Sequence, residues 1–208
     1  MIQAYEQGSD LHRQTASIVL GKPVEDISKE DRQLAKAVNF GLLYGQSAKG
    51  LVVYAETSYG VKLDIEQARQ IRRKFFDEYK HLREWHSQAE KGASSSCEVL
   101  STKLGRKRWL PMEGDVRWQR FTALLNAPVQ GGAADVIKTA IIALQEKLPE
   151  GAGIVSTVHD ELIVEAPLGV AEVVKKIMED VMIESAVSLY STVPFEVEAH
   201  ICEDWSEK

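Results

Sequence analysis

Four side chains that could bind a charged, flat ligand recur at intervals of four residues: Arg32, Lys36, Phe40 and Tyr44. On an α-helix this spacing places them along one slowly drifting face. Two cations followed by two aromatic rings would suit an anion at one end and a planar ring at the other. The positive end of the helix dipole would favour the anion further. The spacing alone favours an amphipathic helix with core aromatics and solvated cations, although the same four side chains would suit an anion and a flat ring.

A second candidate site lies in residues 153–166, which alternate like a β-hairpin with its turn near His159, Asp160 and Glu161. Two acids at a strand turn offer the oxygen ligands that hard cations prefer. An ordinary polar hairpin turn has the same composition, so the residues alone leave both interpretations open.

A basic segment spans residues 97–111 and predicts two strands around a turn at Gly105. Four cations fall within six positions of this turn: Lys103, Arg106, Lys107 and Arg108. By itself such a turn favours a solvated surface. Contact of its cations with nucleic-acid phosphates, without sequence readout, is the alternative.

Two amides, Asn126 and Gln130, are four residues apart and can project from one side of a helix. Amides can bond the acceptors that every base pair presents in the minor groove. Amides beside Pro128 could equally serve as local caps, because proline removes a backbone donor and should kink or break a helix there.

The elements that would position these groups follow from hydrophobic periodicity and end signals. Asp10 or Ser9 can cap a helix that ends at Gly21, and Ser28 with Asp31 resembles a capping box. The remaining expectations are a connecting segment over 47–58, one long helix over 64–92, a helical pattern over 115–148, a helix over 168–190 and a last strand over 194–201.

Composition sets few limits on function. The 208 residues carry a net charge of -6, with 44% hydrophobic and 27% charged residues, which is ordinary for a globular protein. Cys97 and Cys202 show no metal-binding spacing, which favours a reducing compartment. No apolar run reaches the roughly 20 residues of a membrane span, and the N-terminal segment lacks a secretory pattern. We therefore expect a cytoplasmic protein with no membrane partner.

Five segments together resemble family A (Pol I-like) DNA polymerases. They are D-L-H at 10–12, R-x-x-x-K-x-x-N-F-G-x-x-Y-G at 32–45, L-G-R-K-R at 104–108, N-x-P-x-Q-G at 126–131 and V-H-D-E at 158–161. The resemblance implies an α/β fold of the α+β type, with a partial antiparallel palm sheet and a largely helical fingers subdomain. It implies entry from palm to fingers over 1–30, fingers helices over 31–92 and palm over 93–208.

The resemblance also implies roles in template-directed DNA synthesis by a bacterial or phage-type enzyme. His12, Arg32 and Lys36 would hold the dNTP triphosphate, and Lys36 could donate a proton to pyrophosphate. Phe40 would flank the sugar and base, and Tyr44 would stack near the templating position. Asp160 would bind catalytic metal, one of two Mg²⁺ ions, with Glu161 and His159 near the primer end. Primer-template DNA would contact Arg106, Lys107, Arg108, Asn126 and Gln130.

Two departures from the family pattern qualify this expectation. The motif D-[YF]-S-x-[IL]-E, which carries a first metal-binding aspartate, is not present in the 208 residues. Thr122 occupies a position where many members carry arginine, and we do not transfer that role to Arg120. We therefore expect either a fragment or split subunit that needs an upstream polypeptide for the aspartate and thumb, or a non-catalytic DNA- or nucleotide-binding module.

Overall fold

The structure, a computed structural model, describes residues 1–95, 99–111, 113, 116–204 and 207. Cys97 and Trp205 lie outside the described residues. By packing, the chain forms two compact units: the first contains Met1–Leu100 and Lys107–Pro128, and the second contains Ser101–Arg106 and Val129–Lys208. The subdomain boundaries implied by the family resemblance stay a prediction.

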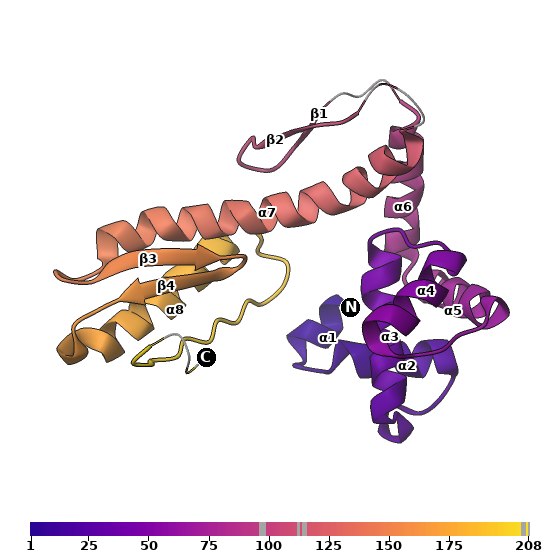
Figure 1. Cartoon of the computed structure of the whole chain (residues 1–208), viewed down its shortest axis with the longest axis horizontal. Coiled ribbons are helices and arrows are strands. Elements are labelled where there is room, and N and C mark those ends of the chain that lie inside the picture. Colours follow the sequence, from indigo (N-terminus) through magenta and orange to yellow (C-terminus); the bar gives the residue numbers. More distant parts are fainter. Residues whose placement is uncertain (96–98, 112, 114–115, 205–206, 208) are drawn as a thin grey trace. The chain divides into compact units, whose positions relative to one another are not determined.

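Helices make up most of the first unit (Figure 1). In chain order they are α1 (Ile2–Glu6), α2 (Leu11–Leu20), the 3₁₀ turn η1 (Val24–Asp26), α3 (Lys29–Leu43), α4 (Ala48–Tyr59), α5 (Ile65–Glu78) and α6 (Lys80–Ala93). A short two-stranded sheet follows, of β1 (Val99–Ser101) and β2 (Lys107–Trp109), and then α7 (Arg117–Lys147), which contributes residues to both units.

The predicted helix ends around α2 and α3 are confirmed. The Asp10 carboxylate accepts hydrogen bonds from the backbone N–H groups of His12 and Arg13, and α2 ends at Gly21 in the left-handed conformation. Ser28 and Asp31 form a complete capping box at the start of α3. Because these side chains satisfy backbone donors that the first helical turn leaves unpaired, they fix where both helices begin.

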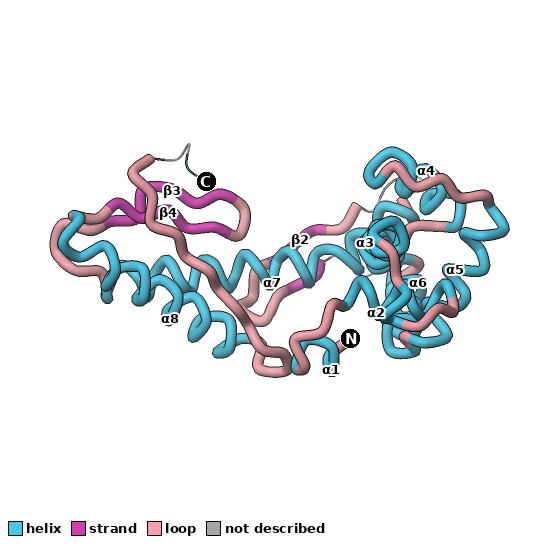
Figure 2. The backbone as a smooth tube through the Cα atoms, turned by 90° about the horizontal axis from the view of Figure 1, so that it is seen from below, coloured by secondary structure: helices cyan, strands magenta, loops and turns pink. Residues whose placement is uncertain are grey.

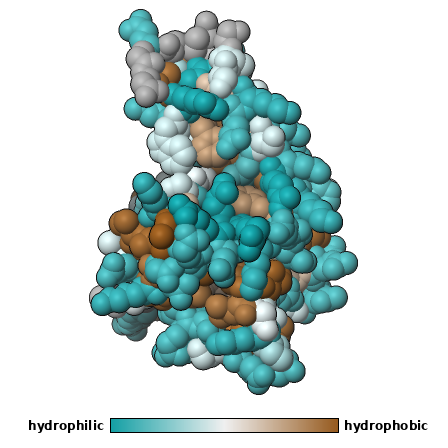
Figure 3. Space-filling view, turned by 90° about the vertical axis from the view of Figure 1, so that its right-hand side faces the viewer, coloured by the Kyte–Doolittle hydropathy of each residue, from teal (hydrophilic) through white to brown (hydrophobic). Residues whose placement is uncertain are grey.

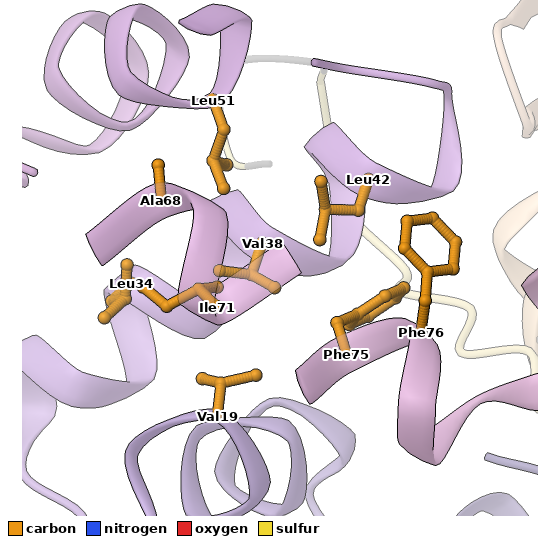
Figure 4. Close-up of a cluster of buried hydrophobic side chains, with 9 residues drawn as sticks. All are labelled: Val19, Leu34, Val38, Leu42, Leu51, Ala68, Ile71, Phe75 and Phe76. Atoms are coloured by element: carbon orange, nitrogen blue, oxygen red, sulfur yellow. The ribbon is translucent and has the colours of Figure 1, made fainter. Parts of the chain in front are cut away.

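The core of the first unit packs α3 against α2, α4 and α5 (Figure 4). Leu34, Val38 and Leu42 recur every four residues on α3 and are buried. The other members of this cluster are Val19 from α2, Leu51 from α4, and Ala68, Ile71, Phe75 and Phe76 from α5. Burying this apolar stripe leaves the opposite face of α3 available to carry polar groups. The face of the first unit seen in Figure 3 is largely hydrophilic, with separate hydrophobic areas.

After α3, one segment without a predicted secondary structure is helical, and one expectation is wrong. The segment 47–58 is helical, since Ser47 caps α4 and Gly60 ends it in the left-handed conformation. The single helix expected over 64–92 is divided at Tyr79, whose backbone has φ -94° and ψ 67°. The Tyr79 ring packs edge-on against Phe75 and its hydroxyl lies 3.0 Å from Thr15 Oγ1, so contacts with another helix override the continuous periodicity.

The second unit packs the end of α7 and α8 (Ala171–Leu189) beside an antiparallel hairpin, as Figure 2 shows. The hairpin consists of β3 (Gly153–Val158) and β4 (Glu161–Glu165), with Val158 opposite Glu161, and a 3₁₀ turn η2 (Leu168–Val170) leads into α8. The buried cluster of this unit contains Ile137, Ala140, Leu144, Leu162 and Val181.

Pro128 does not break α7, which continues through it to Lys147. The two glycines that follow are required by packing in the second unit. A Cβ at Gly131 would lie 2.7 Å from the Thr102 methyl group, and one at Gly132 would lie 2.3 Å from the Tyr190 hydroxyl. The Gly-Gly pair therefore allows close approach to α7 and does not mark the end of a helix.

The strand expected over 194–201 is not formed. Its side chains do alternate, with Val193, Phe195, Val197 and Ala199 partly buried and the residues between them exposed. A strand also needs a paired neighbour, and no strand among the described residues pairs with this segment.

The predicted fold class is confirmed: the chain is of the α+β type, with a largely helical first unit and two small two-stranded sheets. Within the described residues, no helix is both long and apolar enough to cross a membrane.

Gly45 offers a direct test of the packing around the end of α3. It has φ +91°, and a Cβ there would lie 2.7 Å from Phe121 Cε1; Gly60 has φ +67° with nothing within 4 Å. We expect Gly60→Ala to lower the free energy of unfolding by about 1 kcal/mol, from backbone strain alone. Gly45→Ala should cost a further 1–3 kcal/mol, roughly, because of overpacking. Urea denaturation of both variants measures the difference, and equal losses would contradict the close approach.

Candidate nucleotide-binding site

The face of α3 opposite the core carries the four residues singled out by their spacing. Arg32 and Lys36 are half-buried, Phe40 is 44% exposed, and Tyr44 forms the C-cap of the helix. The exposed Phe40 ring is therefore not a core side chain, which argues against the purely amphipathic interpretation. Lys36 forms no ion pair with the residues that the structure describes.

Arg32 is held in place by Asp10 from the start of α2. Arg32 Nε donates to Asp10 Oδ2 at 2.7 Å, while the other carboxylate oxygen caps α2. Burial alone would raise the pKa of Asp10, but hydrogen bonds from Arg32 and from the backbone of Arg13 and His12 outweigh it and lower the pKa. The carboxylate stays charged, so one aspartate both caps α2 and orients the guanidinium of α3.

His12 lies beside this pair in the first turn of α2. Its Nδ1 is 2.9 Å from Asn39 Nδ2, and its ring centroid is 5.9 Å from that of Phe40, tilted by 46°. Burial lowers the pKa of His12, as do the nearby charges of Arg32 and Lys36, and Asp10 opposes them only in part. His12 is therefore held neutral beside Arg32 and Lys36.

Together these residues form a surface with charge at one end and an exposed ring beyond it. Arg32 and Lys36 supply positive charge, His12 supplies a neutral ring, and Phe40 supplies an exposed planar surface. Such a surface can bind an anion and stack a flat ring.

The basic turn is anchored within the second unit. Arg106 Nε donates to Asp135 at 2.9 Å, and Asp135, which is only 2% exposed, also accepts from Thr102. Hydrogen bonds from Thr102 lower the pKa of Asp135; burial opposes them, and the Arg106 guanidinium reinforces them. Arg106, a predicted DNA contact, therefore has part of its guanidinium engaged in an internal ion pair.

Lys107 and Arg108 lie on β2 in the first unit, and both are exposed. The fourth cation, Lys103, lies 4.7 Å from the centre of the Tyr190 ring and donates to the Leu189 carbonyl, which ties it to the end of α8. The four cations of the basic turn therefore differ in how free they are to meet a phosphate, and Lys107 and Arg108 are the exposed pair.

Asn126 and Gln130 both lie on α7. Gln130 is exposed, whereas Asn126 Oδ1 is buried and has no hydrogen-bond partner among the described residues. A buried amide oxygen without a partner is unfavourable, so this atom marks a place where a further donor would stabilise the fold. Among the described residues, neither amide makes a hydrogen bond that caps a helix, which was the other role open to them.

The candidate metal residues sit at the β3–β4 turn. His159 and Asp160 form the turn, with His159 in the left-handed region at φ 55°, and Glu161 begins β4. All three are exposed. Among the described residues no group of three or more histidine, cysteine, aspartate or glutamate side chains is placed to hold a metal ion.

Arg120 has a structural role, which agrees with the decision not to assign it the role of the family's arginine. It is 3% exposed and donates to the carbonyls of Ala93, Ser95 and Pro111. Thr122 Oγ1 bonds backwards to carbonyls of its own helix. Neither side chain replaces the arginine that many family members carry.

Sequence reasoning missed Asp10 and Asn39 as parts of this site. Asp10 was expected only as a helix cap, and Asn39 was part of the motif at 32–45 but was given no role. Asn39 is 6% exposed. Its burial gives it a role, because buried amides need partners, and the local sequence pattern did not reveal that burial.

Comparison with known proteins decides the family. The profile described as DNA polymerase family A matches residues 1–207. The chain belongs to DNA polymerase family A. DNA polymerase I of Aquifex aeolicus is 42% identical over 211 residues, which cover 100% of this chain and 35% of that protein. The thermostable DNA polymerase I of Thermus aquaticus is 37% identical and is matched over 99% of this chain and 24% of its own length.

A solved structure of the family agrees with the fold. The POL domain of Pol1 from M. smegmatis, in complex with DNA primer-template and dNTP, superposes with a TM-score of 0.75 at 31% identity, covering 88% of this chain and 32% of that one. This family A chain therefore spans about a quarter to a third of the length of the relatives it matches.

The dual role of Asp10 predicts different effects of two substitutions. Asp10→Ala removes the cap and the ion pair, and should lower the free energy of unfolding of the first unit by about 1 kcal/mol. Asp10→Asn keeps a good cap and should cost clearly less. Urea denaturation followed by tryptophan fluorescence reports on the first unit, which contains Trp85, Trp109 and Trp118. Equal losses in both variants would assign the stabilisation to the ion pair with Arg32 and not to the cap.

Proposed function

We propose that this chain supplies the dNTP site and one metal-binding carboxylate for template-directed DNA synthesis. In that reaction a primer 3′-hydroxyl attacks the α-phosphate of a dNTP and pyrophosphate leaves. The observation that carries the proposal is the α3 face, where Arg32 and Lys36 lie beside neutral His12 and exposed Phe40. Membership of DNA polymerase family A supports the same reaction class.

Each residue of this face has a proposed role. Arg32, Lys36 and His12 hold the triphosphate, and Lys36 is the proposed proton donor to the departing pyrophosphate. Phe40 lies against the sugar and base. The Tyr44 ring, at the end of α3, stacks near the templating base. Binding at the start of the face gains from the helix dipole as well as from the cations.

The second unit supplies groups for metal and DNA. Asp160 is an exposed carboxylate with no ion-pair partner among the described residues, so it fits one ligand of a hard cation. Two Mg²⁺ ions, when bound, would stabilise the attacking and leaving oxygens. One aspartate is too few for two ions, so we propose that the second bridging carboxylate comes from a further polypeptide segment carrying the palm's first strand and the thumb.

Contacts with primer-template DNA are proposed for the remaining residues. Lys107, Arg108 and the free part of Arg106 contact phosphates. Asn126, whose buried Oδ1 lacks a partner, and exposed Gln130 lie in the minor groove. His159 and Glu161 flank the primer end. Bacterial relatives with this activity make a cytoplasmic location our proposal.

The alternative is a module that binds nucleotide or DNA without catalysis. It is compatible with the same ligand count, since no group of three metal-binding side chains exists in the part of the chain that the structure describes. Both functions need the α3 face to bind dNTP, and they differ in whether the chain takes part in synthesis.

Replacing Lys36 tests the nucleotide site. Lys36→Ala should weaken binding of dNTP–Mg²⁺ at least several-fold, because a hydrogen bond to a charged group contributes about 1.5–3 kcal/mol. Lys62→Ala, an exposed lysine elsewhere in the first unit, is the matched control and should bind like the parent. Calorimetric titration measures both, and equal affinities for the parent and Lys36→Ala would make the cationic face structural.

Primer extension separates the two functions. The chain alone should not extend a primer, whereas a mixture with a polypeptide carrying the palm's first strand and thumb should. In that mixture Asp160→Asn should reduce extension at least about 100-fold, the scale of losing one preorganised electrostatic group. Asp180→Asn, on α8, is the control.

The opposite outcomes are equally informative. Efficient extension by the chain alone would contradict the ligand count. A stable complex in the mixture that does not extend the primer would favour the non-catalytic module.

A further inference from the structure

A hydrogen-bond network of four polar side chains runs through the first unit and ends at His12. The Tyr79 hydroxyl lies 3.0 Å from Thr15 Oγ1, Thr15 Oγ1 donates to Asn39 Oδ1 at 3.0 Å, and Asn39 Nδ2 lies 2.9 Å from His12 Nδ1. Thr15 is fully buried and Asn39 is 6% exposed. Tyr79 lies at the α5–α6 junction, Thr15 and His12 lie on α2, and Asn39 lies on α3. The network therefore connects three parts of the first unit.

The hydrogen bonds of this network have only one consistent direction when Asn39 Oδ1 faces Thr15 and Asn39 Nδ2 faces His12, as in the structure. An amide nitrogen can only donate, so His12 Nδ1 must accept. Thr15 has one hydroxyl hydrogen, which goes to Asn39 Oδ1. The remaining contact of Thr15 must then be accepted from Tyr79. Each donor therefore points toward His12, and the neutral imidazole must carry its own hydrogen on Nε2.

We infer that Tyr79, Thr15 and Asn39 are positioning residues that fix His12 as a neutral ring with its N–H on Nε2, ready to donate to a phosphate oxygen of the bound nucleotide. The phosphate acceptor rests on the proposed function, whereas the tautomer does not. His12 Nε2 has no hydrogen-bond partner among the described residues, so this donor is available.

The arrangement also explains why His12 stays uncharged. A second proton on Nδ1 would face the Asn39 N–H, and two donors cannot satisfy each other. Burial and the neighbouring Arg32 and Lys36 lower the pKa of His12 in the same sense. Two cations already supply charge, and a neutral donor adds a directed hydrogen bond without a third charge to desolvate.

A network that merely joins helices is the competing explanation. It would be satisfied with either amide orientation: if Asn39 turned by 180°, Oδ1 would accept from His12 Nδ1–H, and the Nε2 lone pair would face the ligand. Such a lone pair would repel a phosphate. The tautomer of His12 therefore separates positioning from simple cross-linking.

The test is two-bond ¹H–¹⁵N NMR of the whole chain labelled with ¹⁵N, which distinguishes the two tautomers of each imidazole. The chain has five histidines, and His12→Gln identifies the His12 signals by their loss. We expect Nε2–H in the parent protein at pH 8. An Nδ1–H ring would overturn the inference.

Two variants, each with a matched control variant, test the direction of these hydrogen bonds. Asn39→Asp places an acceptor where Asn39 donates, so the proton of His12 should move to Nδ1; Gln70→Glu, an exposed change of the same charge, should leave it on Nε2. Thr15→Val removes the hydroxyl that orients the amide and should give a mixture of tautomers, whereas Thr57→Val should not. Folding of each variant is checked by its amide spectrum. An unchanged tautomer in a folded Asn39→Asp protein would overturn the inference.

Nucleotide binding is a separate readout. Asn39→Asp should weaken dNTP–Mg²⁺ binding at least several-fold at pH 8, and Gln70→Glu should not. The expected tautomers in the parent and in Asn39→Asp support the positioning role whether or not the parent binds dNTP. A parent protein that binds no dNTP would count against the proposed function alone.

Discussion

Burial of one side of α3 is the constraint on which the candidate site depends. Leu34, Val38 and Leu42 pack against α2, α4 and α5, which fixes the rotation of the helix about its axis. Once that rotation is set, Arg32, Lys36 and Phe40 must lie on the other side. The binding face is therefore a consequence of the core, and damage to the core would turn or loosen the face without touching any of its residues.

Polar contacts adjust what the core has placed. Asp10 anchors the Arg32 guanidinium, and Asn39 anchors the His12 ring. Both contacts join the start of α2 to α3, next to the buried cluster. The two anchors keep one neighbour charged and the other neutral, so the site presents two cations and one uncharged donor within a few residues of an exposed aromatic ring.

Local patterns in the sequence were enough for many features of the fold and site. The four-residue repeat predicted the face of α3, Ser28 and Asp31 predicted its start, and the alternation around His159 predicted the β3–β4 hairpin. These features depend on neighbours within a few residues. Recognition of the family rested on strings of the same local kind.

The features that were missed depend on contacts between distant residues. The division at Tyr79 arises from its contacts with Thr15 and Phe75. Pro128 was expected to kink or break the helix, but α7 continues through it. The glycines that follow allow other side chains to pack closely against α7. The segment 194–201 has the alternation of a strand, but alternation cannot supply a pairing partner. Asn39 was overlooked because its importance lies in what it touches.

The central claim is that the exposed face of α3 is where a nucleotide binds. The most direct measurement is an NMR titration of the ¹⁵N-labelled chain with dNTP and Mg²⁺, following every assigned backbone and histidine signal. We expect the largest shifts at the start of α2 and along α3, at His12, Arg32, Lys36 and Phe40. Nucleotide binding by this face is contradicted if nucleotide leaves these signals unmoved, or if the shifts concentrate on the arginine-lined groove between α5 and α6, which contains Arg69, Arg72 and Arg83.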